Sequence, residues 1–542
     1  MKKLTLFLLT CGLTWQSFAQ TGSLADKPGV LDRLMKAYEK LDLFNGSILV
    51  AAGDKVIYQS GFGWKNTAAG IRNDANTLYR IYSVTKTFTS TVILKLAEEH
   101  KIALDDRLSR FYPSFPNGDS ITIQQLLSHT SGVYDYTRGN DMKDQSEHAF
   151  VTFLSSKPLD FPPGKGWSYS NSGYWLLGFI ISKVTDMSYE DAVKKYIFVP
   201  CGMNNSGFDF KTMKHVNKAT GYETFSEKFK TEAIDIDPPG PYAAGAIYSS
   251  VKDMYRYYRA LQSFQLISQS SLAKAWTPDS LNARYALGWQ VGRFGEKEMF
   301  FHGGGGPGFK SNFAMIPTDQ VCIVLLTNNE NAHLDPLTRM ICNVLFEHPY
   351  KIPFSVSVDS AVLSDYEGYY GMDGSFSLHI SQEAGRLIAQ ASGQSKTTLF
   401  AENVNYFYAP DADAYLEFRS NGKRKSDTLI LRQGERVLTG KRYTPAWGIL
   451  GSATNAGWGD KPDEQMLLTA GRKNAWYIKD IQLRSGVLKF RFNNDWNMNY
   501  GKGDLPGLLK LNGADISVEA GIYDIELDLS DPEKPAYLLN RK

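Results

Sequence analysis

Short apolar runs bounded by turn residues predict strands near both ends of the first 350 residues. Residues 47–51 and 56–60 are two such runs, and Gly53-Asp54 supplies the turn between them. Residues 309–316 and 321–327 form a second pair around a three-residue turn. Each pair is therefore expected to form two adjacent strands.

Apolar residues that recur three or four positions apart predict helices between these strands. The pattern is clearest over residues 83–97, and it predicts further helices over residues 123–128, 174–185 and 337–346. Strands at both ends of a helical middle are typical of one α/β (α+β) domain. We expect this domain to span residues 26–350 and to contain a single antiparallel sheet.

The pattern changes after Pro349, where short alternating runs are separated by turn residues. Residues 351–442 lack a convincing helix and predict a small β domain. Residues 443–542 predict a second β domain, with a turn at Ser485-Gly486. The expected fold is therefore an α/β (α+β) domain followed by two all-β domains.

The first residues have the composition of a secretory signal peptide. Lys2 and Lys3 precede a largely apolar run over residues 4–15, and Ser17-Phe18-Ala19 offers small residues for cleavage before Gln20. The run is too short to span a bilayer, and no later apolar run approaches 18 residues. We therefore expect an exported protein, periplasmic, secreted or at the cell surface, with residues 1–19 removed and no transmembrane segment.

Charge and cysteine content further limit the kinds of partner and covalent cross-link that we expect. The chain has 59 Lys+Arg and 57 Asp+Glu, a net charge of +2, which argues against a nucleic-acid partner. Cleavage of the leader leaves Cys201, Cys322 and Cys342, an odd number that cannot all pair within the chain. Free buried thiols are the favoured interpretation, and one disulfide stays open for an exported protein.

Several common catalytic motifs are absent from the sequence. It contains no Gly-x-Ser-x-Gly, no His-Glu-x-x-His and no Walker A pattern, and its eight histidines are scattered. Gly303-x-Gly305-x-x-Gly308 formally matches a dinucleotide fingerprint. A strand-like run follows it instead of a helix, so no helix N-terminus is available for a phosphate. We therefore expect neither a metal nor an organic cofactor.

Ser83-x-x-Lys86 is the first candidate for chemistry. On a helix these positions share one face, so the lysine can reach the serine hydroxyl. Burial and the helix dipole lower the pKa of such a lysine, which can then activate the serine. Because Ser-x-x-Lys recurs at Ser249, Ser271 and Ser420, the spacing alone is equally consistent with a capping serine beside a surface lysine.

Two companion motifs strengthen that candidate. Tyr169-x-Asn171 is the only Tyr-x-Asn among thirty tyrosines, and a phenol beside a lysine can exchange protons with a serine. His302-Gly303-Gly304-Gly305 follows a strand-like run, and its backbone N–H groups can face an oxyanion. Taken singly, the first motif is also typical of a buried turn tyrosine, and the second of a flexible hairpin.

In order and spacing, the three motifs resemble those of the serine β-lactamase/penicillin-binding-protein superfamily, and most closely its class C and peptidase S12 branch. Residues 28–350 carry the resemblance. Five further phrases resemble the same branch: residues 126–132 (Leu-Leu-Ser-His-Thr-Ser-Gly), 200–203 (Pro-Cys-Gly-Met), 244–249 (Ala-Gly-Ala-Ile-Tyr-Ser), 285–289 (Tyr-Ala-Leu-Gly-Trp) and 305–309 (Gly-Gly-Pro-Gly-Phe). The resemblance implies a β-lactamase/transpeptidase-like domain whose antiparallel sheet is flanked by helices.

The resemblance also implies a role for each motif residue. Ser83 would be the acylated nucleophile, Lys86 its proton-exchange partner and Tyr169 the general base and acid. Asn171 would contact a substrate amide, and the backbone N–H groups of Ser83 and Gly305 would form the oxyanion hole.

The third motif also departs from the family pattern. Together with Gly304, His302 is expected to line the substrate, but it stands where many penicillin-recognising members carry lysine. Histidine is mostly neutral near pH 7, so it holds a substrate carboxylate less firmly. The departure favours ester or aminopeptidase-type substrates over D-alanyl-D-alanine peptides and β-lactams.

A second resemblance covers residues 446–540, which are similar to the β-sandwich modules of SusE/SusF-type starch-binding proteins. Residues 449–458 and 488–501 carry it most clearly. Such modules bind glycans on aromatic faces, so Trp458, Trp476 and Trp496 are candidate glycan contacts. The alternative is that these tryptophans belong to the core of the sandwich.

The combined expectation is an exported, cofactor-free serine hydrolase of carboxypeptidase, D-aminopeptidase or esterase type, with a small-molecule or peptide substrate. One alternative is a non-catalytic glycan- or cell-wall-binding protein built on the same scaffold. A third hypothesis is a transpeptidase-like or β-lactam-sequestering protein that is acylated quickly and deacylated slowly.

Overall fold

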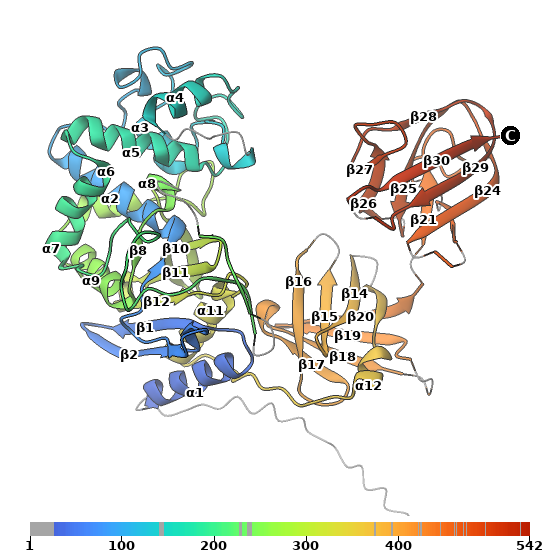
Figure 1. Cartoon of the computed structure of the whole chain (residues 1–542), viewed down its shortest axis with the longest axis horizontal. Coiled ribbons are helices and arrows are strands. Elements are labelled where there is room, and N and C mark those ends of the chain that lie inside the picture. The colour runs from blue at the N-terminus through green and yellow to red at the C-terminus, as the bar shows by residue number, and fades with distance from the viewer. Residues whose placement is uncertain are drawn as a thin grey trace, which may run out of the picture. The chain divides into compact units, whose positions relative to one another are not determined.

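The chain divides into two compact units, the first ending at Pro353 and the second spanning Phe354–Lys542 (Figure 1). The predicted leader, residues 1–19, lies outside the described part of the chain. The computed structural model describes residues 26–139, 146–226, 230–235, 241–372, 376–391, 394–420, 422, 425–444, 446–459, 461, 463–469, 471–472, 474–493, 495–531 and 533–542.

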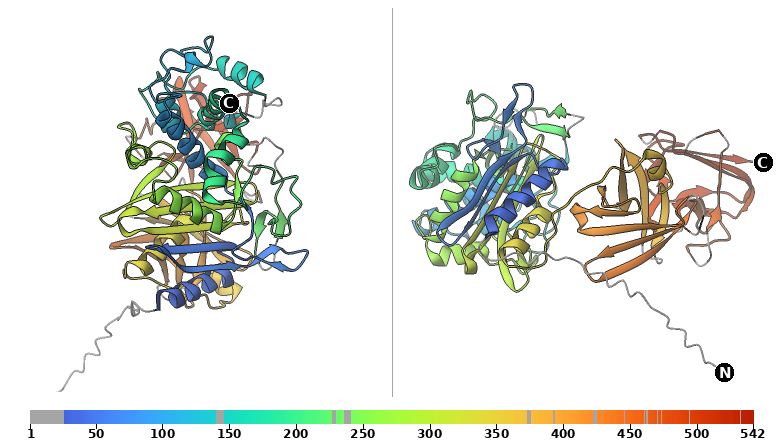
Figure 2. Two further views of the ribbon diagram at one scale, coloured as in Figure 1. Left: turned by 90° about the vertical axis from the view of Figure 1, so that its left-hand side faces the viewer. Right: turned by 90° about the horizontal axis from the view of Figure 1, so that it is seen from below.

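A six-stranded sheet of order β2-β1-β12-β11-β10-β9 forms the centre of the first unit (Figure 2). Its strands are β1 (Gly46–Ala52), β2 (Lys55–Phe62), β9 (Gln290–Phe294), β10 (Lys297–Gly306), β11 (Phe309–Ile316) and β12 (Val321–Thr327). Every adjacent pair is antiparallel, as predicted, but the unit also contains three two-stranded sheets and not a single sheet. Because β1 pairs with β12, strands from opposite ends of the domain lie side by side.

Helices cover both faces of this sheet, as the alternation along β12 shows. Ile323 and Leu325 pack into a cluster with Leu34 and Ile341, which lie on α1 (Lys27–Lys40) and α11 (Leu334–Leu345). Val324 and Leu326 point the other way, into the larger cluster that α2 (Thr85–Glu98) and α9 (Val251–Gln262) also enter. Because β12 is buried on both faces, its sequence is a continuous apolar run.

The remaining elements of the first unit surround the larger cluster. The helices are α3 (Ile123–Ser128), α4 (Glu147–Ser155), α5 (Asn171–Thr185), α6 (Tyr189–Val193), α7 (Val199–Cys201), α8 (Tyr242–Gly245) and α10 (Gln269–Trp276). Three two-stranded sheets pair β3 (Trp64–Asn66) with β4 (Ile71–Arg72), β5 (Tyr79–Arg80) with β8 (Tyr248–Ser249) and β6 (Tyr222–Phe225) with β7 (Lys230–Glu232).

The predicted helices are present, with differences at their first or last residues. The α3 bounds agree with the prediction. The α5 helix starts three residues early because the Ser170 hydroxyl caps it and accepts from the Gly173 N–H. The prediction that a helix starts at Ser83 was wrong, because that residue lies in a 3₁₀ turn and α2 begins at Thr85.

The second unit contains a closed barrel in which eight antiparallel strands follow one another in chain order. They are β13 (Gly368–Met372), β14 (Phe376–Glu383), β15 (Arg386–Ala391), β16 (Lys396–Ala401), β17 (Tyr406–Ala409), β18 (Ala414–Arg419), β19 (Thr428–Gln433) and β20 (Arg436–Tyr443). Pairing of β13 with β20 closes the barrel. Alternate residues along β18, including Leu416 and Phe418, enter its core, and a single-turn helix α12 (Ser360–Ser364) precedes it.

The rest of this unit forms two sheets that share one core. One sheet has the order β22-β21-β25-β26-β27, with β28 paired to β25, and the other has the order β23-β24-β29-β30. Trp447 and Phe490 from the first sheet pack with Ile525 from the second. The strands are β21 (Trp447–Leu450), β22 (Glu464–Gln465), β23 (Leu467–Leu468), β24 (Ala475–Leu483), β25 (Gly486–Phe492), β26 (Asp495–Lys502), β27 (Leu509–Leu511), β28 (Ile516–Val518), β29 (Gly521–Asp528) and β30 (Ala536–Arg541).

The expected fold class, a mixed α/β domain followed by all-β structure, is confirmed. Cys201, Cys322 and Cys342 are free thiols, two of them buried and Cys201 half-buried. In the described ranges, no helix is both long enough and apolar enough to cross a membrane.

Candidate active site

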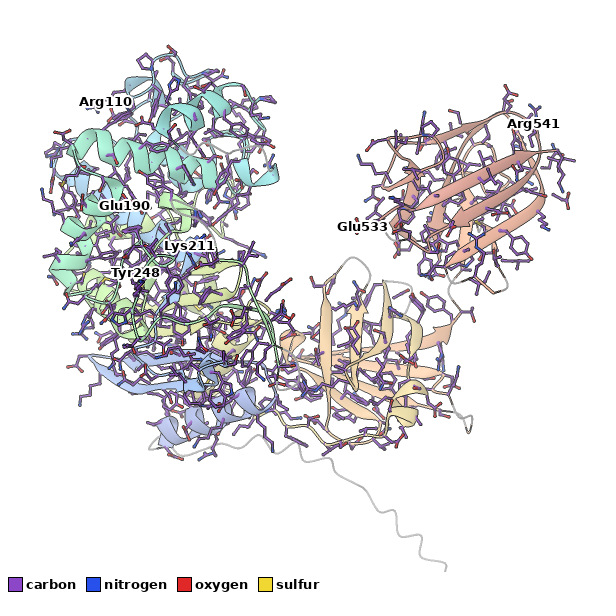
Figure 3. The ribbon with its side chains drawn as sticks, in the orientation of Figure 1. Arg110, Glu190, Lys211, Tyr248, Glu533 and Arg541 are labelled. Carbon is purple, nitrogen blue, oxygen red and sulfur yellow. The ribbon has the colours of Figure 1, made fainter. Side chains whose placement is uncertain are left out.

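Ser83 lies in the 3₁₀ turn Tyr82–Val84, which continues directly into α2. The chain enters this turn from β5, which pairs with β8 at Tyr248. Tyr248 is labelled in Figure 3. Tyr82 has a φ of 44°, a left-handed conformation that costs a non-glycine residue about 1–3 kcal/mol. Its hydroxyl donates to the Pro307 carbonyl at 2.8 Å, which holds the strained turn in place. Ser83 itself is half-buried.

Lys86 is fully buried one turn further along, and its ammonium is surrounded by oxygen acceptors. It donates to Ser83 Oγ at 3.2 Å, to Asn171 Oδ1 at 2.8 Å and to the Ala244 carbonyl at 2.8 Å. Burial lowers the pKa of Lys86 from 10.5 to about 7, although the Asp135 carboxylate acts in the opposite direction. A lysine in this state exchanges protons readily near neutral pH.

Tyr169 reaches the same point from the loop that precedes α5. The Lys86 ammonium lies 4.8 Å from the centre of its ring. Burial raises the pKa of Tyr169 well above its usual value, and the interaction of its hydroxyl with Ser83 only partly offsets this effect. The phenol is therefore protonated at neutral pH.

Asn171 is the first residue of α5 and joins the lysine to a carboxylate. Its Oδ1 accepts from Lys86, and its Nδ2 donates to Asp135 Oδ2 at 3.2 Å. These two bonds fix the orientation of the amide, because only Nδ2 can donate. The second hydrogen of Nδ2 remains for another acceptor.

The glycines of β10 allow this strand to approach the Ser83 turn. A Cβ on Gly304 would lie 2.1 Å from the Ile81 carbonyl oxygen and 2.4 Å from Ser311 Oγ, so a side chain has no room there. Gly305, the predicted second oxyanion donor, is exposed and pairs with Lys310 on β11. A Cβ on Gly305 would lie 2.9 Å from the Lys310 ammonium. No sequence motif indicates this cation, which only the strand register reveals.

The His302 imidazole is buried beside the Tyr169 ring, with 6.4 Å between ring centres. Its Nδ1 donates to the Gly303 carbonyl at 2.7 Å, so its Nε2 accepts from the Tyr285 hydroxyl at 3.0 Å. Burial lowers the pKa of His302 to about 3. Both nitrogens are occupied and the ring is neutral, so it offers no cation to a substrate carboxylate.

His129 is a further residue of the site that was not predicted, although it belongs to the phrase at residues 126–132. This residue has a φ of 62° at the end of α3 and is buried. Its Nδ1 accepts from the Ser170 N–H at 3.1 Å, and its ring centre lies 4.3 Å from that of Tyr169. Burial keeps the pKa of His129 well below its usual value, so a neutral ring supports the Tyr169-x-Asn171 loop.

The three predicted glycan contacts lie in the second unit and have different environments. Trp476 is 8% exposed and belongs to the core of the two sheets, so it presents no face to a glycan. Trp458 and Trp496 are 40% and 44% exposed and stack with 6.0 Å between ring centres. The Arg491 guanidinium lies 4.7 Å from the Trp496 ring and forms a buried salt bridge with Asp463 at 2.6 Å.

The structure thus brings four predicted side chains, those of Ser83, Lys86, Tyr169 and Asn171, into one connected group. Gly304 places β10 against the turn that carries Ser83. No three His, Cys, Asp or Glu side chains within the described ranges are arranged to hold a metal ion. The group contains a hydroxyl, an amine of lowered pKa and a protonated phenol, which together can carry out acyl transfer.

Comparison with known proteins agrees with this geometry. Penicillin-binding protein 4* of Bacillus subtilis (strain 168) is 28% identical over 434 residues, which cover 74% of this chain and 95% of that protein. The octameric penicillin-binding protein homologue of Pyrococcus abyssi superposes with a TM-score of 0.55 at 23% identity, covering 77% of this chain and 100% of that chain. The D-amino acid amidase of Ochrobactrum anthropi SV3 superposes with a TM-score of 0.50 at 22% identity, covering 60% of this chain and 98% of that chain.

The family model described as Beta-lactamase matches residues 31–339, which is more than half of the 542 residues. The matched range contains the sheet, the Ser83 turn, α5 and the glycines of β10. The chain therefore belongs to the β-lactamase family, whose members, penicillin-binding proteins among them, are serine hydrolases.

Proposed function

We propose that the protein hydrolyses an ester or amide through an acyl-enzyme on Ser83. The observation that carries this proposal is the hydrogen bond between the Ser83 hydroxyl and a buried lysine whose pKa is about 7. Near neutral pH a substantial fraction of Lys86 is an uncharged amine. That amine takes the proton of Ser83 as Oγ attacks the carbonyl carbon, and the N–H groups of Ser83 and Gly305 stabilise the oxyanion.

Lys86 and Tyr169 take complementary parts in this proposal. The raised pKa of Tyr169 keeps its phenol protonated at neutral pH, so a proton is available there for the leaving group. The protonated Lys86 then returns the proton that it took from Ser83 to the neighbouring Tyr169 phenolate. In the second half-reaction water attacks the acyl carbon and gives a proton to the Lys86 amine. Tyr169 protonates the departing Ser83 Oγ, and Lys86 then restores the Tyr169 proton.

The charges beside β10 favour substrates whose leaving group carries no carboxylate. His302 is neutral and hydrogen-bonded within the protein. Lys310 is a partly exposed cation over Gly305, and ion pairs of exposed groups contribute only about 0–1 kcal/mol. Amides and esters of amino acids fit this arrangement better than D-alanyl-D-alanine peptides or β-lactams.

Intact-mass measurement after treatment with a fluorophosphonate tests the proposal. We expect one adduct per chain, located at Ser83 by peptide mapping and absent from Ser83→Ala. Turnover of p-nitrophenyl acetate should exceed that of nitrocefin. Stable labelling by penicillin without turnover would favour slow deacylation instead, and absence of any adduct would favour a non-catalytic binding protein.

We further propose that the exposed tryptophan pair of the second unit binds a glycan. Trp458 and Trp496 are stacked side by side, and sugar rings pack on such aromatic faces. In affinity electrophoresis through starch or another polysaccharide, the full chain should be retarded. Trp496→Ala should weaken this binding at least about tenfold. Leu468→Ala, which truncates an exposed residue of the same region, should not, and equal retardation of all three proteins would refute the proposal.

We also propose that the chain is exported and that Ala19 precedes the cleavage site. Lys2, Lys3 and the apolar run over residues 4–15 support this proposal. Amino-terminal sequencing of the protein recovered from its native compartment would show Gln20 as the first residue.

A further inference from the structure

We propose that the Asp135 carboxylate binds a cationic amine on the acyl part of the substrate, next to the scissile carbonyl. The inference rests on the proposed function and names its substrate class: amides or esters of amino acids with a free amino group. Four side chains carry it, those of Asp135, Asn171, Lys86 and Ser83, which form one hydrogen-bonded chain that leads to the nucleophile.

Asp135 is held rigidly at the end of this chain. It is only 6% exposed. One carboxylate oxygen accepts from the Thr137 N–H at 3.1 Å, and the other accepts from Asn171 Nδ2 at 3.2 Å. Both donors are neutral, and each oxygen has a second lone pair for a further donor. The group is therefore positioned but not neutralised.

No cation within the described ranges forms a salt bridge with this carboxylate. Arg138 is three residues away, but its guanidinium donates to Asp160 in two hydrogen bonds of 2.8 and 2.5 Å. The Lys86 ammonium is committed to three other acceptors. A buried carboxylate without a cationic partner is unfavourable, and a ligand that supplies the cation removes this cost.

The location of Asp135 points to the acyl side of the scissile bond. Only the Asn171 amide separates the carboxylate from Lys86, which itself contacts Ser83. An amine on the α-carbon is two bonds from the carbonyl carbon that Ser83 attacks, so it stays close to this amide. An acyl group without the amine would leave the carboxylate unpaired and be discriminated against.

A purely electrostatic role predicts a different result. The Asp135 charge raises the pKa of Lys86, so its removal lowers that pKa and moves the acidic limb of the rate profile to lower pH. This shift affects every substrate alike. Recognition of an amine affects only substrates that carry one, so the two roles are separable.

The experiment compares alanine p-nitroanilide, in both enantiomers, with the p-nitroanilides of propionic acid and N-acetylalanine at pH 7. In the wild type, we expect kcat/KM for one alanine enantiomer to exceed that for the propionyl compound by about 30-fold or more. Asp135→Asn should reduce this ratio to within about threefold, and Asp135→Glu should restore part of it. Asp54→Asn, which removes an exposed carboxylate in the turn between β1 and β2, should leave the ratio unchanged.

Each outcome separates the hypotheses. If the wild type shows no preference for either alanine substrate, or if Asp135→Asn lowers kcat/KM equally for all substrates, the inference is wrong while the hydrolase proposal stands. If the wild type cleaves none of them and Ser83 takes no fluorophosphonate, the hydrolase proposal itself fails. The rate of fluorophosphonate labelling of Asp135→Asn shows whether its Ser83 site remains assembled.

Discussion

Alanine at position 83 is expected to lower kcat/KM for p-nitrophenyl acetate by about 10⁴- to 10⁶-fold, because no acyl-enzyme can form without the hydroxyl. The turn that carries Ser83 is already held by Tyr82 and Val84, which are buried, so the variant should fold normally. Steady-state kinetics and a thermal unfolding curve measure the two effects separately.

Ser271→Ala is the matched control for this variant. Ser271 starts a second Ser-x-x-Lys sequence that ends at Lys274, but it lies on α10 and hydrogen-bonds to Ser268 at the helix start. Its removal should change kcat/KM less than about twofold. Residual activity of Ser83→Ala above a few per cent would show that another group is the nucleophile.

Methionine at position 86 is expected to lower kcat/KM about 10³-fold, since it keeps the length of the side chain and removes the proton acceptor. In the wild type, kcat/KM should rise with pH through an apparent pKa near 7, as Lys86 loses its proton. The variant should lack this limb. A wild-type profile that is flat between pH 5.5 and 8.5 would contradict the assignment of Lys86 as the base.

The same substitution has a pH-dependent effect on stability whose sign follows from the lowered pKa. The pKa of Lys86 is about 7 in the folded chain and near 10.5 when unfolded, so the unfolded state binds more protons between these values. The free energy of unfolding of the wild type therefore rises through the titration of this residue as pH increases from 7 to 10. Relative to Lys86→Met, the wild-type Tm should rise over that range, and a constant difference would argue against a buried neutral amine.

Much of the candidate group around Ser83 could be predicted from sequence because each part lies in a short motif. The motifs at Ser83 and Tyr169 indicated polar side chains near the starts of helices, and the motif at His302 indicated a polar side chain beside glycines. Their convergence depends on long-range pairing, such as that of β1 with β12, which no local pattern specifies. The order of the motifs supplied that information only through resemblance to a family.

Other residues could not be assigned because their role depends on the side-chain environment. His302 was expected to line the substrate, but the Tyr285 hydroxyl and burial make it an internal, neutral group. Lys310 and Asp135 lie in no recognised motif. The strand register places Lys310 beside Gly305, and burial distinguishes Asp135 from exposed carboxylates. Trp476 was not distinguished from Trp496 in the sequence, and only its packing in the core of the two sheets separates them.

The space around the β10 glycines differs from one position to the next, which determines where this protein could be varied in the laboratory. A methyl group on Gly303 would have only the Ser311 carbonyl as a neighbour, at 3.8 Å, and one on Gly305 would meet the movable end of Lys310. Gly304, between them, touches rigid backbone. Libraries aimed at new selectivity should therefore randomise the two outer positions and hold the middle one constant.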